Sequence, residues 1–159
     1  MVENPYYKMG EILMELIKHI GIYVDDEIVE KNFYMNVFSM RIICENFEDE
    51  GEVYNQLLGE QNVKVSITKL ITERGIDTGL GDMIELIKLK SSVSKQNKID
   101  RAICDVGLSH FSIGVDGIED TVNRILKNGG GKITDIIKIG ERKCCFCYDP
   151  EGNGIELIE

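Results

Sequence analysis

The 159-residue sequence lacks an excess of basic side chains and any long apolar run. It contains 18 Lys and Arg residues and 28 Asp and Glu residues, which gives a formal charge of −10. An acidic chain without a basic stripe repels phosphate groups, so we expect no nucleic acid and no anionic membrane surface as a partner. No stretch reaches the ~20 apolar residues of a membrane span, and the first residues lack the basic start of a signal peptide. These absences predict a soluble cytoplasmic protein of one domain or two very small ones.

The cysteines fit neither a disulfide framework nor a paired Cys-x-x-Cys zinc site. There are five of them, an odd number, and three lie close together at Cys144, Cys145 and Cys147. We interpret these three as reduced thiols on a strand, where small residues alternate between its two sides. A redox or metal role is the alternative, and loss of activity after replacing all three by Ser would support it.

The sequence contains an internal repeat. Residues 19–25 (HIGIYVD) and 110–116 (HFSIGVD) both begin with His and end with Val-Asp. A helical apolar spacing follows each of them, and in the second copy Asp116 and Glu119 predict an N-terminal cap. Each half then closes on the strand sequence Ile-Glu-Leu-Ile, at residues 84–87 and 155–158. The repeated unit is therefore expected to be strand, helix, strand, strand, strand.

The remaining segments define the predicted domain organisation. Two further strands are expected in each half, at residues 40–45 and 62–71 and at residues 132–139 and 143–149. An insertion at residues 47–61 suggests a short helix, glycines 129–131 end the second long helix, and residues 149–154 form a hairpin turn. The expected units are an extension, a first βαβββ module, a linker and a second βαβββ module, at residues 1–15, 16–90, 91–107 and 108–159.

Four residues occupy matched positions of the repeat. His19 and His110, the only histidines, open equivalent strands, and Glu85 and Glu156 lie within the two closing strands. Strand alternation places each His on a face with small or polar neighbours, away from the large aliphatic residues. If the halves pair about a pseudo-twofold axis, the four side chains converge, and two buried carboxylates then require a cation. Two imidazoles and two carboxylates form a neutral shell for one divalent ion, and Ni or Zn is expected ahead of Co, Mn or Fe.

These motifs resemble the vicinal oxygen chelate superfamily, and within it most closely lactoylglutathione lyase (glyoxalase I). The resemblance covers residues 16–159 and rests on the two His-x-x-Ile-x-Val-Asp segments, the Ile-Glu-Leu-Ile strands and the closing Tyr-Asp-Pro-Glu-Gly-Asn-Gly turn. It implies an α+β fold of two βαβββ modules that form an open, barrel-like mixed sheet. It also implies metal ligands at His19, Glu85, His110 and Glu156, and a homodimer.

The resemblance further implies proton abstraction next to a carbonyl, through a metal-bound enediolate that links a methylglyoxal-thiol hemithioacetal to a lactoylthioester. Glu156 would be the catalytic base and Glu85 a persistent ligand. The substrate is expected to be a small molecule, such as a thiol adduct or an acyl thioester. Two alternatives stay open: an isomerase that resembles methylmalonyl-CoA epimerase, and a non-catalytic small-molecule binding or resistance protein whose pocket the insertion reshapes.

Overall fold

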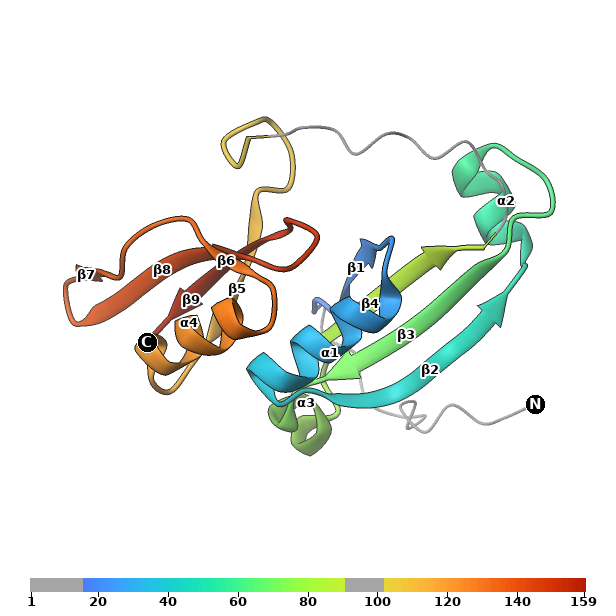
Figure 1. The fold of residues 1–159 in the computed structure, drawn as a ribbon. Coiled ribbons are helices and arrows are strands. Elements are labelled where there is room, and N and C mark those ends of the chain that lie inside the picture. The colour runs from blue at the N-terminus through green and yellow to red at the C-terminus, as the bar shows by residue number, and fades with distance from the viewer. Residues whose placement is uncertain (1–15, 91–101) are drawn as a thin grey trace.

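The computed structural model describes residues 16–90 and 102–159, which form two modules of one strand–helix–strand pattern (Figure 1). The first module contains β1 (His19–Tyr23), α1 (Glu27–Phe38), β2 (Arg41–Asp49), α2 (Glu52–Leu58), β3 (Val65–Ile71), α3 (Glu73–Thr78) and β4 (Met83–Leu89). The second contains β5 (His110–Gly114), α4 (Ile118–Lys127), β6 (Gly131–Lys132), β7 (Ile137–Ile139), β8 (Arg142–Tyr148) and β9 (Gly154–Ile158). The predicted extension and most of the predicted linker lie outside the described residues.

The two modules build separate mixed sheets of the same topology. Strand order is β1-β4-β3-β2 in the first sheet and β5-β9-β8-β6 in the second, where β7 also pairs with β8. In both sheets the first strand runs parallel to the last, while the other strand pairs are antiparallel. The predicted α+β fold is confirmed: neither sheet closes, and among the described residues no strand pair joins the two.

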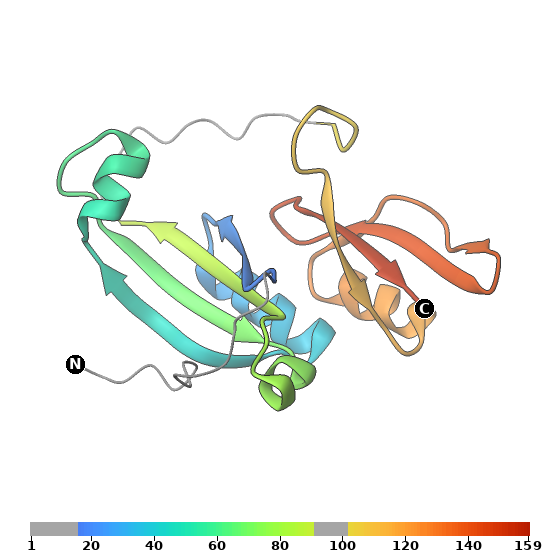
Figure 2. The ribbon, with the colours of Figure 1, turned by 180° about the vertical axis from the view of Figure 1, so that it is seen from behind.

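Alternation along the strands decides which face of each sheet is covered. The aliphatic residues Ile22, Leu86 and Leu157 point to the helix side and are at most 8% exposed. Together with Phe33 and Tyr34 of α1 and Ile125 of α4 they form one core that spans both modules. Both helices lie in front of the sheets in Figure 1 and behind them in Figure 2. The opposite face of each sheet, which carries the histidines, is therefore the face that α1 and α4 leave uncovered.

The two helices also bind the modules to each other through polar contacts. The guanidinium Nε of Arg124 in α4 donates to the carbonyl of Val37 at 3.0 Å, and Asn36 donates to Asn128 at 3.1 Å. At the other end of α1, backbone amides of Asp25 and Asp26 donate to the Glu151 carboxylate at 2.6–2.9 Å. A negative charge at a helix N-terminus is favourable, so the 149–154 turn of the second module stabilises the start of α1.

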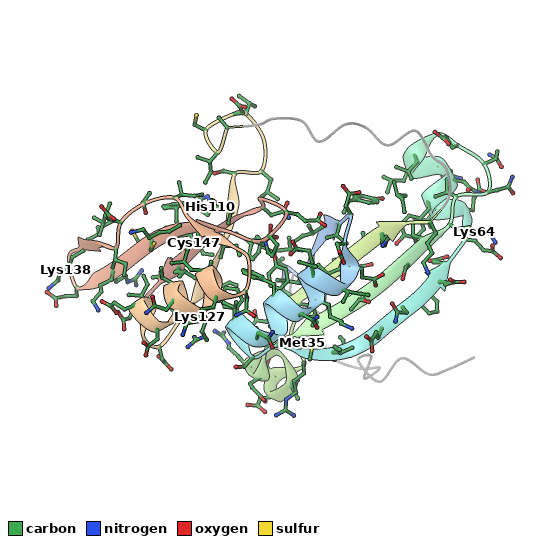
Figure 3. All side chains as sticks on the ribbon, viewed as in Figure 1. Met35, Lys64, His110, Lys127, Lys138 and Cys147 are labelled. Atoms are coloured by element: carbon green, nitrogen blue, oxygen red, sulfur yellow. The ribbon has the colours of Figure 1, made fainter. Side chains whose placement is uncertain are left out.

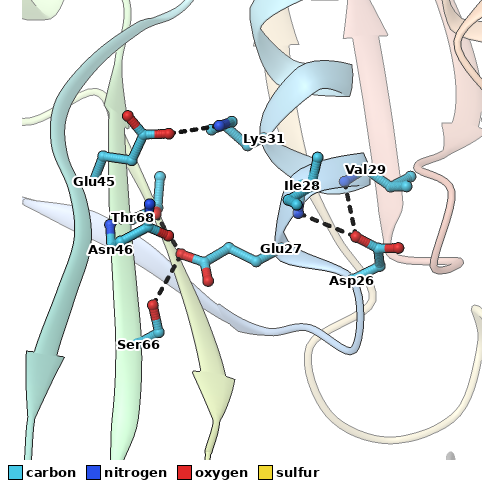
Figure 4. A network of polar contacts seen from close by, with 9 residues as sticks. All are labelled: Asp26, Glu27, Ile28, Val29, Lys31, Glu45, Asn46, Ser66 and Thr68. Carbon is cyan, nitrogen blue, oxygen red and sulfur yellow. Dashed lines mark hydrogen bonds and ion pairs between the residues drawn. The ribbon is translucent and has the colours of Figure 1, made fainter.

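A buried polar network fixes α1 on the first sheet (Figure 4). Glu27, 7% exposed, accepts hydrogen bonds from the hydroxyls of Ser66 and Thr68 on β3. Asp26, one residue earlier, accepts from the amides of Ile28 and Val29, both at 3.1 Å, and so caps the helix. Because a buried carboxylate without partners is costly, these hydroxyls allow Glu27 to lie between helix and sheet.

A second buried carboxyl group, Glu30, lies at the junction between the modules. It is 0% exposed, and its Oε1 accepts from the amide of Glu151 at 2.9 Å. Close by, the equally buried Asp149 accepts from the Tyr34 hydroxyl and from Asn153. Burial, the charges of Asp149 and Glu151 and a hydrogen bond to Asp149 raise the pKa of Glu30 to about 9. Glu30 is therefore protonated at neutral pH, beside the buried Asp149 side chain.

Replacing Glu30 by Gln is expected to make stability less sensitive to rising pH. Between an ordinary pKa of 4.5 and the folded-state pKa of about 9, the folded state holds a proton that the unfolded state has lost. Wild-type stability therefore falls as pH rises through this window, by up to about 1.4 kcal/mol per pH unit from this group. The amide stays neutral, so the advantage of Glu30→Gln should grow with pH in denaturant unfolding experiments. The exposed Glu141→Gln is the control, and parallel curves for Glu30→Gln and wild type would contradict the assignment.

The structure corrects several local predictions. The cap of α4 is Gly117, with φ of +89° and no side-chain hydrogen bond, and Asp116 does not cap this helix. β2 continues to Asp49 through two register shifts, so the insertion begins later than predicted. The predicted strand at 132–139 is divided into β6 and β7, and α3 was not predicted. These differences lie at turns and bulges, where local backbone pairing, rather than the periodicity of apolar residues, decides where a helix or strand ends.

The interpretation of the cysteines as packing residues agrees with their positions on β8. Cys145 and Cys147 lie on the same side of the strand, are 0% exposed and have their sulfurs 3.8 Å apart. Burial and the neighbouring Cys145 raise the pKa of Cys147 to about 12, so its thiol is not ionised at neutral pH.

In the part of the chain that is described, no helix has the length and apolar character of a membrane span.

Candidate metal centre

The first pair of candidate ligands lies on the uncovered face of the first sheet. β1 runs parallel to β4 in a register that sets Gly21 opposite Glu85. The imidazole of His19, on the same face of β1 as Gly21, reaches Glu85, with 3.1 Å between His19 Nε2 and Glu85 Oε2. Glu85 is 6% exposed, so its carboxylate is almost fully withdrawn from water. The ammonium of Lys69 on β3 approaches the same oxygen at 3.5 Å.

The second pair occupies the equivalent position in the second sheet. His110 on β5 lies 3.5 Å from Glu156 on β9, measured from Nε2 to Oε2 (Figure 3 labels His110). The Ser112 hydroxyl donates to the same Glu156 oxygen, and Ser109 lies 3.0 Å from the other ring nitrogen of His110. The ring of Phe146 packs edge-on against His110 with centroids 4.9 Å apart. Ser109 and Phe146 therefore fix the imidazole so that its Nε2 points to Glu156.

The geometry of each pair fits two ligands of one cation. Imidazole nitrogen and carboxylate oxygen bind Zn²⁺ at about 2.0–2.2 Å, so two such ligands on one ion lie about 3.0–3.5 Å apart. The separations of 3.1 Å and 3.5 Å match this spacing. Nitrogen and oxygen donors without thiolate also suit Zn, Ni, Co, Mn or Fe. The residues present thus fit half of a four-ligand site in each module.

The two pairs do not gather into one site within the described part of this chain. Across residues 16–90 and 102–159, no group of three or more His, Cys, Asp or Glu side chains is placed to hold a metal ion. Each His meets the Glu of its own module because β1 pairs with β4 and β5 with β9. The helices α1 and α4 join the modules on the opposite side of the sheets (Figure 2). The described part of the chain therefore presents two separate half-sites.

A known protein family contains chains with this arrangement of two equivalent modules. The sequence matches the Glyoxalase/Bleomycin resistance protein/Dioxygenase superfamily over residues 16–157. The chain belongs to this superfamily. This match confirms the resemblance to the vicinal oxygen chelate superfamily that the motifs indicated. Members of the superfamily include enzymes that act on small molecules. No curated protein gave a significant match.

Solved structures of the superfamily share the fold of this chain at low sequence identity. A glyoxalase family protein from Bacillus cereus has a TM-score of 0.79 and 18% identity, over 96% of this chain and 98% of that one. A glyoxalase family protein from Enterococcus faecalis has a TM-score of 0.56 and 21% identity, over 91% and 98%. The trypanothione-dependent glyoxalase I of Leishmania major has a TM-score of 0.59 and 17% identity, over 92% and 87%. At such identities these similarities establish the fold.

The insertion of this superfamily member packs on the same face as the first half-site. Tyr54 of α2 forms an apolar cluster with residues of β3 and β4 that project from the uncovered face, among them Ile67. Burial, and after it the charge of Glu85, raises the pKa of Tyr54 and of Tyr23. Both phenols are therefore neutral donors at physiological pH. α2 thus covers part of the first sheet beside Glu85.

Several residues around the half-sites had not been predicted as functional candidates. Lys69 lies on β3, where the alternate positions Val65, Ile67 and Ile71 on the same face are aliphatic. A charged residue among aliphatic residues on one strand face is a sequence pattern that could have identified Lys69 as a candidate. Ser109 and Phe146 gave no signal of their own, because their proximity to His110 depends on loop geometry and on the β8–β9 register.

Proposed function

We propose that this protein is a divalent-metal-dependent lyase or isomerase of the glyoxalase I type, with His19, Glu85, His110 and Glu156 as metal ligands. The observation that carries the proposal is the pair of His–Glu contacts, 3.1 Å and 3.5 Å, at equivalent positions of two equivalent sheets. Two such half-sites supply the two nitrogens and two carboxylates that balance a divalent charge. The superfamily membership and the fold shared with a glyoxalase I support the same conclusion.

Each complete site is proposed to form between two copies of the chain. Within the described residues the half-sites lie on the side of the sheets opposite the buried core residues and remain apart. A homodimer in which the first module of one protomer faces the second module of its partner joins His19 and Glu85 with His110 and Glu156 of the partner subunit. Two identical sites then follow from the twofold symmetry.

The chemistry proposed for this site is transfer of a proton between adjacent carbons. A divalent cation held by His19, Glu85, His110 and Glu156 would supply positive charge beside the oxygens of the two reacting carbons. Glu156 is proposed to move the proton, since within residues 16–90 and 102–159 no ammonium group forms an ion pair with its carboxylate, whereas Lys69 pairs with Glu85. The Ser112 hydroxyl holds one Glu156 oxygen, which leaves the other oxygen to face a substrate.

Turnover assays on metal-loaded protein test this function directly. Protein loaded in turn with Ni, Zn, Co and Mn is expected to convert the adduct of methylglyoxal with one of several thiols into the thioester, whose formation is followed by absorbance. The thiol series should include glutathione and trypanothione. A parallel assay with methylmalonyl-CoA distinguishes an epimerase, and turnover of neither substrate, despite stoichiometric metal, would contradict the proposed reaction.

A further inference from the structure

Lys69 makes the first half-site chemically different from the second. Its Nζ lies 3.5 Å from Glu85 Oε2, the oxygen that His19 Nε2 also approaches, at 3.1 Å. β3 and β4 pair Lys69 directly with Glu85, while β8 and β9 pair Phe146 with Glu156. At matched positions of the two sheets, one ligating carboxylate therefore adjoins an ammonium group and the other adjoins an aromatic ring.

The Lys69 side chain is partly exposed on the face of the first sheet that carries Glu85. It projects from the uncovered face, between the aliphatic side chains of Ile67 and Ile71, and its side chain is 35% exposed. Within residues 16–90 and 102–159, Glu85 is the only carboxylate within ion-pair distance of its ammonium. If Glu85 binds a cation, the attraction of Glu85 for Lys69 weakens, and the ammonium then lies beside the cation with its donors free for a ligand.

The charge of the assembled site follows from a simple count. Two neutral imidazoles, two carboxylates and one divalent ion sum to zero, and one Lys69 for each site makes the total +1. This local positive charge lies in a chain whose formal charge is −10. A site of charge +1 with Phe146 on its other side favours a ligand that carries one or more negative charges close to Lys69.

We infer that Lys69 is a substrate-binding residue that selects an anionic oxygen ligand, and that the second half-site binds the less polar part of the same molecule. The inference rests on the proposed function, because it takes Glu85 as a metal ligand. The ligand class that Lys69 selects is a small molecule with a negatively charged oxygen at the end that lies against the first sheet. Lys69 binds this charge and holds the molecule toward the first sheet.

Oxalate, a small dianion with two neighbouring oxygens, is the probe for this inference. Binding of oxalate to the zinc-loaded dimer is measured by calorimetry for wild type, Lys69→Met, Lys69→Arg and Lys138→Met. Lys138 lies on β7 at the outer end of the second module, so its replacement removes the same charge far from the first half-site (Figure 3). Lys69→Met should weaken oxalate binding by about tenfold or more, Lys69→Arg should restore most of it, and Lys138→Met should bind as wild type does.

Zinc titration of the same variants separates ligand binding from a structural role. Lys69→Met should bind zinc at least as tightly as wild type, because no ammonium then competes for Glu85. Undiminished oxalate binding by Lys69→Met, or a loss of zinc from this variant, overturns the inference while the proposed function stands. Wild type that binds no zinc overturns both. If Lys69→Met does not fold, Lys69→Gln, which keeps a donor without the charge, is subject to the same expectations.

Discussion

Two variants that each bind no metal should regain metal binding when they are mixed. One variant, His19→Ala with Glu85→Ala, lacks the first half-site, and the other, His110→Ala with Glu156→Ala, lacks the second. In a mixed dimer, one site combines both damaged halves and the other combines both intact halves. Random pairing makes half of the dimers mixed, so the mixture should hold about a quarter of the wild-type metal.

The measurement for this prediction is the metal-to-protein ratio after unfolding, mixing, refolding and gel filtration. Each variant refolded alone is the control and should hold no stoichiometric metal. The test does not depend on knowing the substrate, because metal content is the readout. Recovery of nothing above the two controls, with mixed dimers demonstrated by differently sized tags, would show that the half-sites do not combine between chains.

Replacing Glu156 by Gln should lower turnover far more than metal affinity. The amide keeps the shape of the side chain and an oxygen for the Ser112 hydroxyl, but it cannot accept the proton that the reaction moves. Loss of a general base costs about 10²–10⁴-fold in turnover. Metal affinity should fall less, since three ligands and an amide oxygen remain. Steady-state rates and metal titration of the same preparations give both quantities.

Glu85→Gln is the matched control for this experiment, since it makes the same chemical change at the equivalent position of the other sheet. It is expected to weaken metal binding more than Glu156→Gln does, because the Glu85 carboxylate is more deeply buried and is proposed to stay on the metal. If the two variants lose activity and metal in equal proportion, the assignment of distinct roles to the two carboxylates is wrong.

Local patterns were sufficient to predict the repeated unit and the face on which each candidate ligand lies. His19, Gly21 and Tyr23 alternate with Ile20 and Ile22, and this alternation alone separates the helix-covered side from the uncovered side. The ends of elements were less predictable. Gly117, rather than Asp116, caps α4, because the backbone there takes a left-handed conformation that no side-chain pattern specifies.

The sequence by itself determined that two histidines and two glutamates occupy equivalent strand positions, since alternation and repeat spacing are properties of local chain geometry. Only the tertiary structure decided that each His meets the Glu of its own module, that the two pairs stay apart in the described chain, and that Lys69 lies beside Glu85. Those facts depend on strand register and on the packing of α1 against α4, which bring together residues far apart in sequence. The same packing buries Glu30 next to Asp149 and thereby raises the pKa of Glu30.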